Sequence, residues 1–147
     1  MGIIEYLANE ANILRLYSLR ATTKAQSGHP SSCLSSAEII ATLFFKEMNF
    51  DSENIDYLDN DEFILSKGHA APILYAALAE LDVIPKDKLL TLRNFSSELE
   101  GHPVPRLNGV RVATGSLGQG ISIGLGIAYA KKLNNTGRRV YVLVGDG

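Results

Sequence analysis

Residues 114–147 read TGSLGQGISIGLGIAYAKKLNNTGRRVYVLVGDG, and this stretch decides the fold. A glycine-rich turn at 114–120 leads into a predicted helix at 118–133, although each glycine inside a helix costs about 1 kcal/mol relative to alanine. The run VYVLV at 140–144 is continuously apolar, as in parallel strands that are buried on both faces. We therefore expect a turn, a helix and a buried strand in this order.

Hydrophobic periodicity predicts the elements that precede this stretch. Apolar or small residues at a spacing of three and four predict an amphipathic helix at 3–25. The pattern Ser35-x-x-Glu38 has the form of a capping box, so a second helix should begin at Ser35, bury Ile39 among others and end at Asn49. The remaining predicted elements are strands at 63–65 and 110–113 and helices at 70–81 and 86–92. Helices that alternate with short strands favour the α/β class, with a parallel sheet and flanking helices.

Composition and charge narrow the possible partners. The 147 residues are 46% hydrophobic and carry a formal net charge of −2, with 14 scattered basic residues, so no basic patch indicates nucleic acid or an anionic membrane. The only cysteine, Cys33, cannot form an internal disulfide and fits a reducing compartment. The longest mostly apolar stretch, 121–130, is too short to cross a bilayer. We expect a soluble, cytoplasmic protein that binds neither nucleic acid nor membrane.

All three histidines of the chain follow a glycine, in the motifs GHP at 28–30, GHA at 68–70 and GHP at 101–103. Glycine lets a backbone bend sharply or approach a ligand, and functional residues concentrate on such loops. A zinc site is the less favoured reading, because the histidines are far apart in sequence and match no local ligand spacing. Imidazoles that donate to hydroxyls or phosphate, or that move protons near neutral pH, fit the pattern better.

The glycine-rich turn at 114–120 permits two interpretations. Its backbone N–H groups and the helix that follows it offer a site for an anion or for the polar edge of a cofactor. Gly118-x-Gly120-x-x-x-Gly124, followed by Asp146, imitates a nicotinamide dinucleotide fingerprint. Alternatively, Asp146 at the tip of the strand suits a hard cation that holds a diphosphate. We favour the second interpretation, because a dinucleotide site leaves the Gly-His loops unexplained.

Taken together, these motifs resemble those of transketolases. The resemblance rests on SGHP at 27–30, SKGHA at 66–70 followed by LY at 74–75, GHP at 101–103, TGSLGQG at 114–120 and GDG at 145–147. It implies the thiamine diphosphate-binding fold of the pyrophosphate domain and transfer of a two-carbon ketol unit from a ketose to an aldose. The sequences of these motifs are most similar to those of split transketolases, whose catalytic halves are separate polypeptides.

The resemblance implies roles for individual residues at the cofactor. Gly115, Ser116 and Leu117 would contact the aminopyrimidine end of thiamine diphosphate. His69 and Gly147 would lie at its diphosphate. In this family the cofactor accepts the electrons of the breaking carbon–carbon bond, and the protein positions and polarises it.

Further roles concern the metal and the sugar. Asp146 would bind Mg²⁺ or Ca²⁺. His29 and His102 would act on the sugar phosphate substrate, donating hydrogen bonds to its hydroxyls and moving protons as the carbon–carbon bond breaks.

The resemblance also implies residues that this sequence does not contain. The family's second metal ligand, an asparagine, follows GDG, and the glutamate that activates the aminopyrimidine belongs to a pyrimidine-binding domain. We therefore expect residues 1–147 to be the N-terminal part of an incomplete domain, whose partner is a C-terminal transketolase half or subunit, and to form a homo-oligomer. We also expect the strand at 140–144 and the helix face Gly120, Gly124 and Ala128 to lack cover. A non-catalytic truncated fragment is the alternative.

Overall fold

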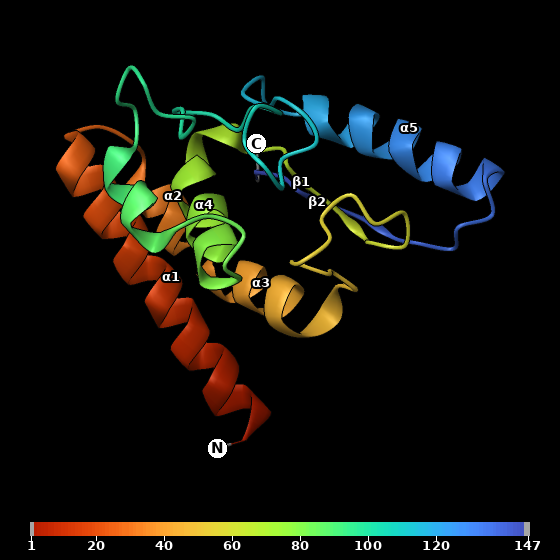
Figure 1. Ribbon diagram of the computed structural model, residues 1–147, viewed down its shortest axis with the longest axis horizontal. Coiled ribbons are helices and arrows are strands. Elements are labelled where there is room, and N and C mark those ends of the chain that lie inside the picture. The colour runs from red at the N-terminus through yellow and green to blue at the C-terminus, as the bar shows by residue number, and fades with distance from the viewer. Residues whose placement is uncertain (1, 146–147) are drawn as a thin grey trace.

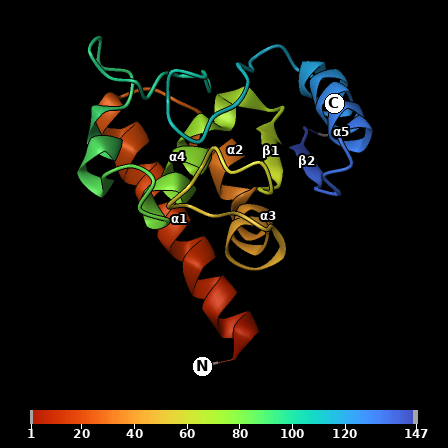
Figure 2. The same ribbon diagram turned by 45° about the vertical axis from the view of Figure 1, so that its right-hand side comes forward.

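The computed structural model describes residues 2–145 and has three layers. A two-stranded sheet of β1 (Glu62–Leu65) and β2 (Val140–Leu143) lies between α5 (Gln119–Leu133) on one side and a group of helices on the other (Figures 1 and 2). The helices of that group are α1 (Ile3–Ala25), α2 (Pro30–Leu34), α3 (Ala37–Thr42) and α4 (Ala71–Glu80). The predicted α/β class with a parallel sheet and flanking helices is confirmed.

The two strands pair in parallel, with Glu62 opposite Val140. Their side chains alternate between the two helical layers. On β1, Ile64 points toward α5, whereas the ring centroid of Phe63 lies 5.1 Å from that of Phe44 on the opposite side. Every residue of β2 is only half-buried, and among the described residues β1 is the only strand paired with it, which agrees with the expectation that the strand at 140–144 lacks part of its cover.

The core lies between α1 and α4. The predicted bounds of α1 are confirmed, and its buried residues include Leu14 and Ala21. Almost every residue of α4 is buried, because this short helix packs against α1, α3 and the 3₁₀ helix η3 (Lys86–Thr91). The prediction for 70–81 is confirmed apart from a 3₁₀ turn, η2 (Gly68–Ala70), that precedes α4. The helix predicted at 86–92 also forms, but as the 3₁₀ helix η3.

The helix predicted at 35–49 is wrong in its details. The chain turns helical already at Pro30, breaks at Ser35 and Ser36, and continues as α3 and a π-helical turn, η1 (Leu43–Glu47). The capping box does not form, because both serine hydroxyls donate to the carbonyl of Ser32, at 3.2 and 2.8 Å. The break shifts which residues face the core, and Ile39 is 47% exposed.

The strand predicted at 110–113 does not form. The N–H of Val110 donates to the carbonyl of Leu107 in a turn, at 3.1 Å. The Arg111 guanidinium instead ties this segment to another loop, through the Asp56 carboxylate at 2.8 Å and the Ile55 carbonyl at 2.9 Å. The segment therefore forms an irregular loop held by the Arg111 side chain.

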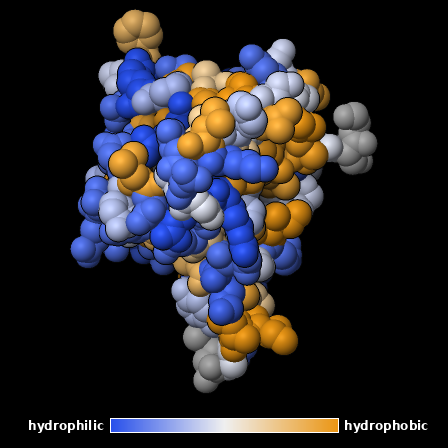
Figure 3. Space-filling view, turned by 90° about the vertical axis from the view of Figure 1, so that its right-hand side faces the viewer, coloured by the Kyte–Doolittle hydropathy of each residue, from blue (hydrophilic) through white to orange (hydrophobic). Residues whose placement is uncertain are grey.

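The small-residue face of α5 is covered, contrary to expectation. A side chain at Gly120 would come within 2.6 Å of Ser66 Cβ, and one at Gly124 would collide with Val142 Cγ2, so this face lies directly on the sheet. The uncovered face of α5 is a different one, formed by apolar residues four apart: Leu117 just before the helix, then Ile121, Leu125, Tyr129 and Leu133. Figure 3 shows apolar side chains gathered on this flank of the molecule. Within residues 2–145, no helix is long and apolar enough to cross a membrane.

Candidate functional site

Loops from distant parts of the chain meet beyond the end of β1. The Thr114 hydroxyl donates to the carbonyl of Leu65 at 2.7 Å, which ties the glycine-rich turn to the strand. Gly68 permits this contact, because a Cβ there would lie 2.7 Å from the Thr114 carbonyl oxygen and 2.9 Å from the Gly115 nitrogen. The backbones of two predicted site loops therefore touch.

The three Gly-His loops converge on the same region. The His29 and His69 rings meet edge to face, with their centroids 5.2 Å apart. The His102 ring lies over the backbone of Gly115, with its Cδ2 atom 3.2 Å from the place where a Cβ of Gly115 would be. The three histidines therefore lie near one another, although their motifs are far apart along the chain.

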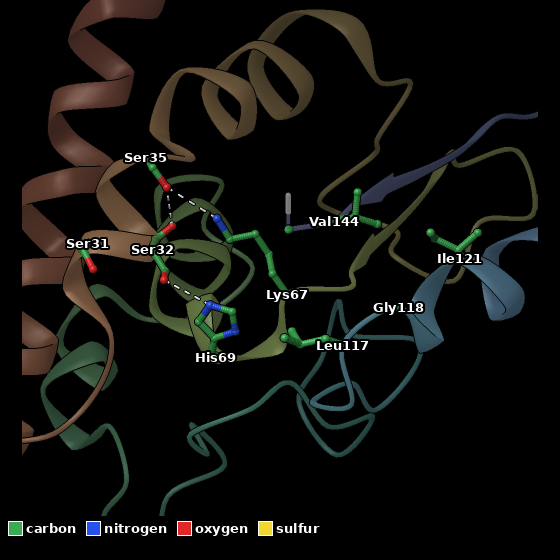
Figure 4. A pocket seen from close by; sticks show the side chains of 10 residues that line it. Ser31, Ser32, Ser35, Lys67, His69, Leu117, Gly118, Ile121 and Val144 are labelled. Carbon is green, nitrogen blue, oxygen red and sulfur yellow. Dashed lines mark hydrogen bonds between the residues drawn. The ribbon is translucent and has the colours of Figure 1, made fainter. Parts of the chain in front are cut away.

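A pocket of about 500 Å³ opens beside His69 (Figure 4). One wall is polar: His69 Nε2 lies 3.1 Å from Ser32 Oγ, and Lys67 donates to Ser36 Oγ at 2.9 Å. The opposite wall is largely apolar and is formed by Leu117, Gly118, Ile121, Val144 and Gly145. The pocket thus offers hydrogen bonds and positive charge on one side and a nonpolar surface on the other.

The electrostatics of the pocket favour an anion. No carboxylate of residues 2–145 forms a salt bridge with Lys67, so its charge is not neutralised there. Gly118, the N-cap of α5, also lines the pocket and brings the positive end of the helix dipole to it. Burial lowers the pKa of His69, and the neighbouring His29, Lys67 and His102 lower this pKa further. At neutral pH His69 is therefore a neutral imidazole that can donate one hydrogen bond.

The structure brings most of the predicted site residues together. His69 and Leu117 line the pocket, Gly115 lies under His102, and Ser116 is exposed in the turn that begins α5. Asp146 and Gly147 lie outside the described residues, but their neighbour Gly145 lines the pocket.

Sequence reasoning missed other residues of the pocket. One is Lys67, which lies in the SKGHA motif at 66–70. A positive charge next to a glycine is the signal that could have identified Lys67 as a binding residue. Ser31, Ser32 and Ser35 follow the first GHP motif, but nothing in their spacing indicated that they would face His69 and Lys67.

Two alternatives fit the geometry less well. Among residues 2–145, no group of three or more histidine, cysteine or acidic side chains could hold a metal ion. A dinucleotide fingerprint needs a strand directly before the glycine-rich turn, and its second glycine must leave the backbone open to the pyrophosphate. Here the preceding segment is a loop, and Gly120 packs against Ser66.

Comparisons of the sequence with known proteins give one consistent result. The sequence profile of the family "Transketolase, thiamine diphosphate binding domain" matches residues 7–147. Over 145 residues the chain is 52% identical to transketolase of Pongo abelii, a match that covers 98% of this chain and 23% of that protein. It is 37% identical over 142 residues to a 6-deoxy-6-sulfo-D-fructose transketolase subunit of Clostridium sp. (strain MSTE9), covering 96% of this chain and 52% of that subunit.

Solved structures give the same result. Transketolase of Campylobacter jejuni superposes with a TM-score of 0.90 at 35% identity, over 100% of this chain and 24% of that one. Transketolase from Leishmania mexicana gives a TM-score of 0.88 at 32% identity, covering 100% of this chain and 23% of that one. The chain thus spans about a quarter of the length of these proteins.

Proposed function

Because this chain belongs to the transketolase family, we propose that it supplies the diphosphate-binding part of an enzyme that transfers a two-carbon ketol unit from a ketose to an aldose. The observation that carries the proposal is the two-sided pocket beside His69. Thiamine diphosphate combines an anionic tail with a thiazolium ring and an aminopyrimidine ring, whose flat faces can pack against apolar side chains. A polar, cationic wall opposite an apolar wall suits such a molecule.

The described residues fit the cofactor in charge as well as in shape. Lys67 and the N-terminus of α5 attract the diphosphate, since both present positive charge to the pocket. His69, held at Ser32, donates a hydrogen bond to the same group. When bound, thiamine diphosphate supplies the electron sink for carbon–carbon bond cleavage.

The exposed backbone of the glycine-rich turn is proposed to hold the other end of the cofactor. Gly115, Ser116 and Leu117 would contact the aminopyrimidine. Leu117 is 67% exposed, so its side chain is free to be covered by a ligand. Gly115 keeps the turn narrow enough for His102 to lie across it.

A divalent cation, Mg²⁺ or Ca²⁺, is proposed to link the diphosphate to the protein. Asp146 would supply a carboxylate oxygen, the ligand type that both ions prefer, and Gly147 would lie against the diphosphate. The position of Gly145 in the pocket wall supports this, because the two residues follow it directly.

His29 and His102 are proposed to act on the sugar phosphate. Both side chains are exposed beside the pocket, unlike His69, which is half-buried. Exposed imidazoles can reach the hydroxyls of a bound sugar and move a proton near neutral pH.

Catalysis is proposed to require a pyrimidine-binding domain, on a C-terminal half or a separate subunit. Support comes from the length of the relatives, of which this chain spans 23% in a full transketolase and 52% in a transketolase subunit. We also propose that the protein works in the cytoplasm as a homo-oligomer. The exposed apolar residues of α5 favour association, because monomers rarely leave so large an apolar surface open to water.

Calorimetry tests the proposal. The chain, supplied with the polypeptide that carries the pyrimidine-binding domain, should bind thiamine diphosphate saturably in the presence of Mg²⁺ and transfer ketol units. The chain alone should bind weakly and show no turnover. Asp146→Ala should abolish the metal-dependent binding, whereas unchanged affinity would contradict the metal assignment. Saturable binding of NAD in place of thiamine diphosphate would favour the dinucleotide alternative.

A further inference from the structure

We propose that Tyr75, on α4, is a positioning residue whose hydroxyl holds the Gly101-His102 loop so that the His102 ring lies over Gly115. The inference rests on the proposed function only for its catalytic consequence, because the geometry can be tested without any turnover. Tyr75 contacts neither the pocket nor a reacting atom and would act through His102.

The hydroxyl of Tyr75 bridges the loop on both sides of Gly101. It lies 3.0 Å from the carbonyl oxygen of Glu100 and 3.1 Å from that of His102. A single O–H proton is shared between these two acceptors. The loop has no helix or strand to satisfy these carbonyls, so the hydroxyl fixes the backbone directly beside the imidazole.

The ring of Tyr75 is held rigidly. Tyr75 is 1% exposed and packs in the centre of the core, so its ring cannot turn to follow a moving loop. Burial raises the pKa of Tyr75 well above its ordinary value, and the nearby Glu100 carboxylate raises this pKa further. The hydroxyl therefore stays protonated, and remains a donor, throughout the working pH range.

A second residue braces the same loop from another side. The Arg93 guanidinium lies over the Cα of Gly101 and occupies the space that a side chain would need. The backbone N–H of Arg93 donates to the carbonyl of Leu99 at 2.8 Å, which holds the two segments together. The loop is thus fixed at its backbone by Tyr75 and covered by Arg93, whereas the His102 ring itself is exposed.

Nuclear magnetic resonance of the full chain provides the direct test. Tyr75→Phe keeps the ring in the core and removes only the bridging hydroxyl. We expect it to weaken the nuclear Overhauser contact between the His102 ring and the Gly115 α protons. It should also raise amide hydrogen exchange at 101–102 about tenfold, the effect of one lost hydrogen bond. The His29 ring signals should not move. Tyr141→Phe, on β2, is the matched control, because among the described residues the Tyr141 hydroxyl accepts a hydrogen bond from Arg139 alone.

Kinetics in the complete enzyme separates this proposal from the proposed function. With cofactor saturating, Tyr75→Phe should lower kcat/KM for the ketose about tenfold and leave the apparent affinity for thiamine diphosphate unchanged. The loss should vanish in a His102→Ala background, because the hydroxyl then has no ring to position. An unchanged His102–Gly115 contact in Tyr75→Phe would overturn the positioning role. A weakened contact with unchanged kinetics would uphold the positioning role and refute the substrate role given to His102.

Discussion

Alanine at Gly124 and alanine at Gly126 should have opposite effects on stability, although both glycines lie in the middle of α5. Alanine in a helix is favoured over glycine by about 1 kcal/mol. Gly126 faces open space, so Gly126→Ala should raise the free energy of unfolding by about that amount. At Gly124 the new methyl group would collide with Val142 Cγ2 and lie 3.5 Å from Ile64 Cδ1. Overpacking of this kind costs about 1–3 kcal/mol, so Gly124→Ala should be net destabilising by about 1 kcal/mol.

Urea or thermal unfolding of the two variants beside the wild type measures the difference. For a chain of this size, a gap of about 2 kcal/mol between them corresponds to roughly 4–8 °C in Tm. The double variant Gly124→Ala with Val142→Ala should recover part of the loss, because the colliding methyl group is then absent. If Gly124→Ala stabilised the protein as much as Gly126→Ala, the close packing of α5 on the sheet would be refuted.

The histidines should separate by kinetic signature: His69→Ala should weaken cofactor affinity about ten- to hundredfold, whereas His29→Ala and His102→Ala should lower ketol-transfer efficiency with cofactor saturating. Titrations and initial rates decide this, and wild-type values in all three variants would make the Gly-His loops ordinary turns. A pH effect is expected at Glu10, whose pKa is raised by burial and then by the charge of Glu80. Since folding favours its protonated form, the penalty exists at neutral pH and disappears as pH falls through the raised pKa. Glu10→Gln should therefore raise Tm more at pH 7 than at pH 4, and an equal change at both would exclude this origin.

The sequence predicted the elements whose signals are local. α1 was predicted to the residue from its apolar spacing, and in the structure it ends at Gln26, which takes the left-handed conformation common at helix C-termini. The register of α3 was not predicted, because it depends on the hydroxyls of Ser35 and Ser36, which donate to the backbone carbonyl of Ser32. The composition of the segment 110–113 is typical of a strand. The segment is nevertheless a loop, in which Arg111 binds Asp56, 55 residues earlier in the sequence.

In the candidate site, too, local sequence signals were readable and long-range contacts were not. The shared Gly-His pattern predicted a functional role for the three histidines, and the structure places their loops near one another. The serines that face His69 and Lys67 were not predicted, because only the packing of α2 against η2 brings these side chains together. Tyr75 belongs to the LY pair at 74–75, yet its role depends on two carbonyl groups of a loop more than 20 residues away in the sequence.

The parallel pairing of β1 with β2 has a consequence for how the chain folds. Beside the strands, the N–H of Arg139 donates to the carboxylate of Asp61, 78 residues earlier in the chain. During synthesis β1 leaves the ribosome long before β2 exists, so β1 at first has no strand of the described sheet to pair with, and Ile64 is not yet covered by α5. Contacts this distant form slowly, and such intermediates are prone to aggregate. The helices α1, α3 and α4 can pack much earlier, so the folding nucleus should lie among them and the half of the pocket that α5 provides should be the last to form.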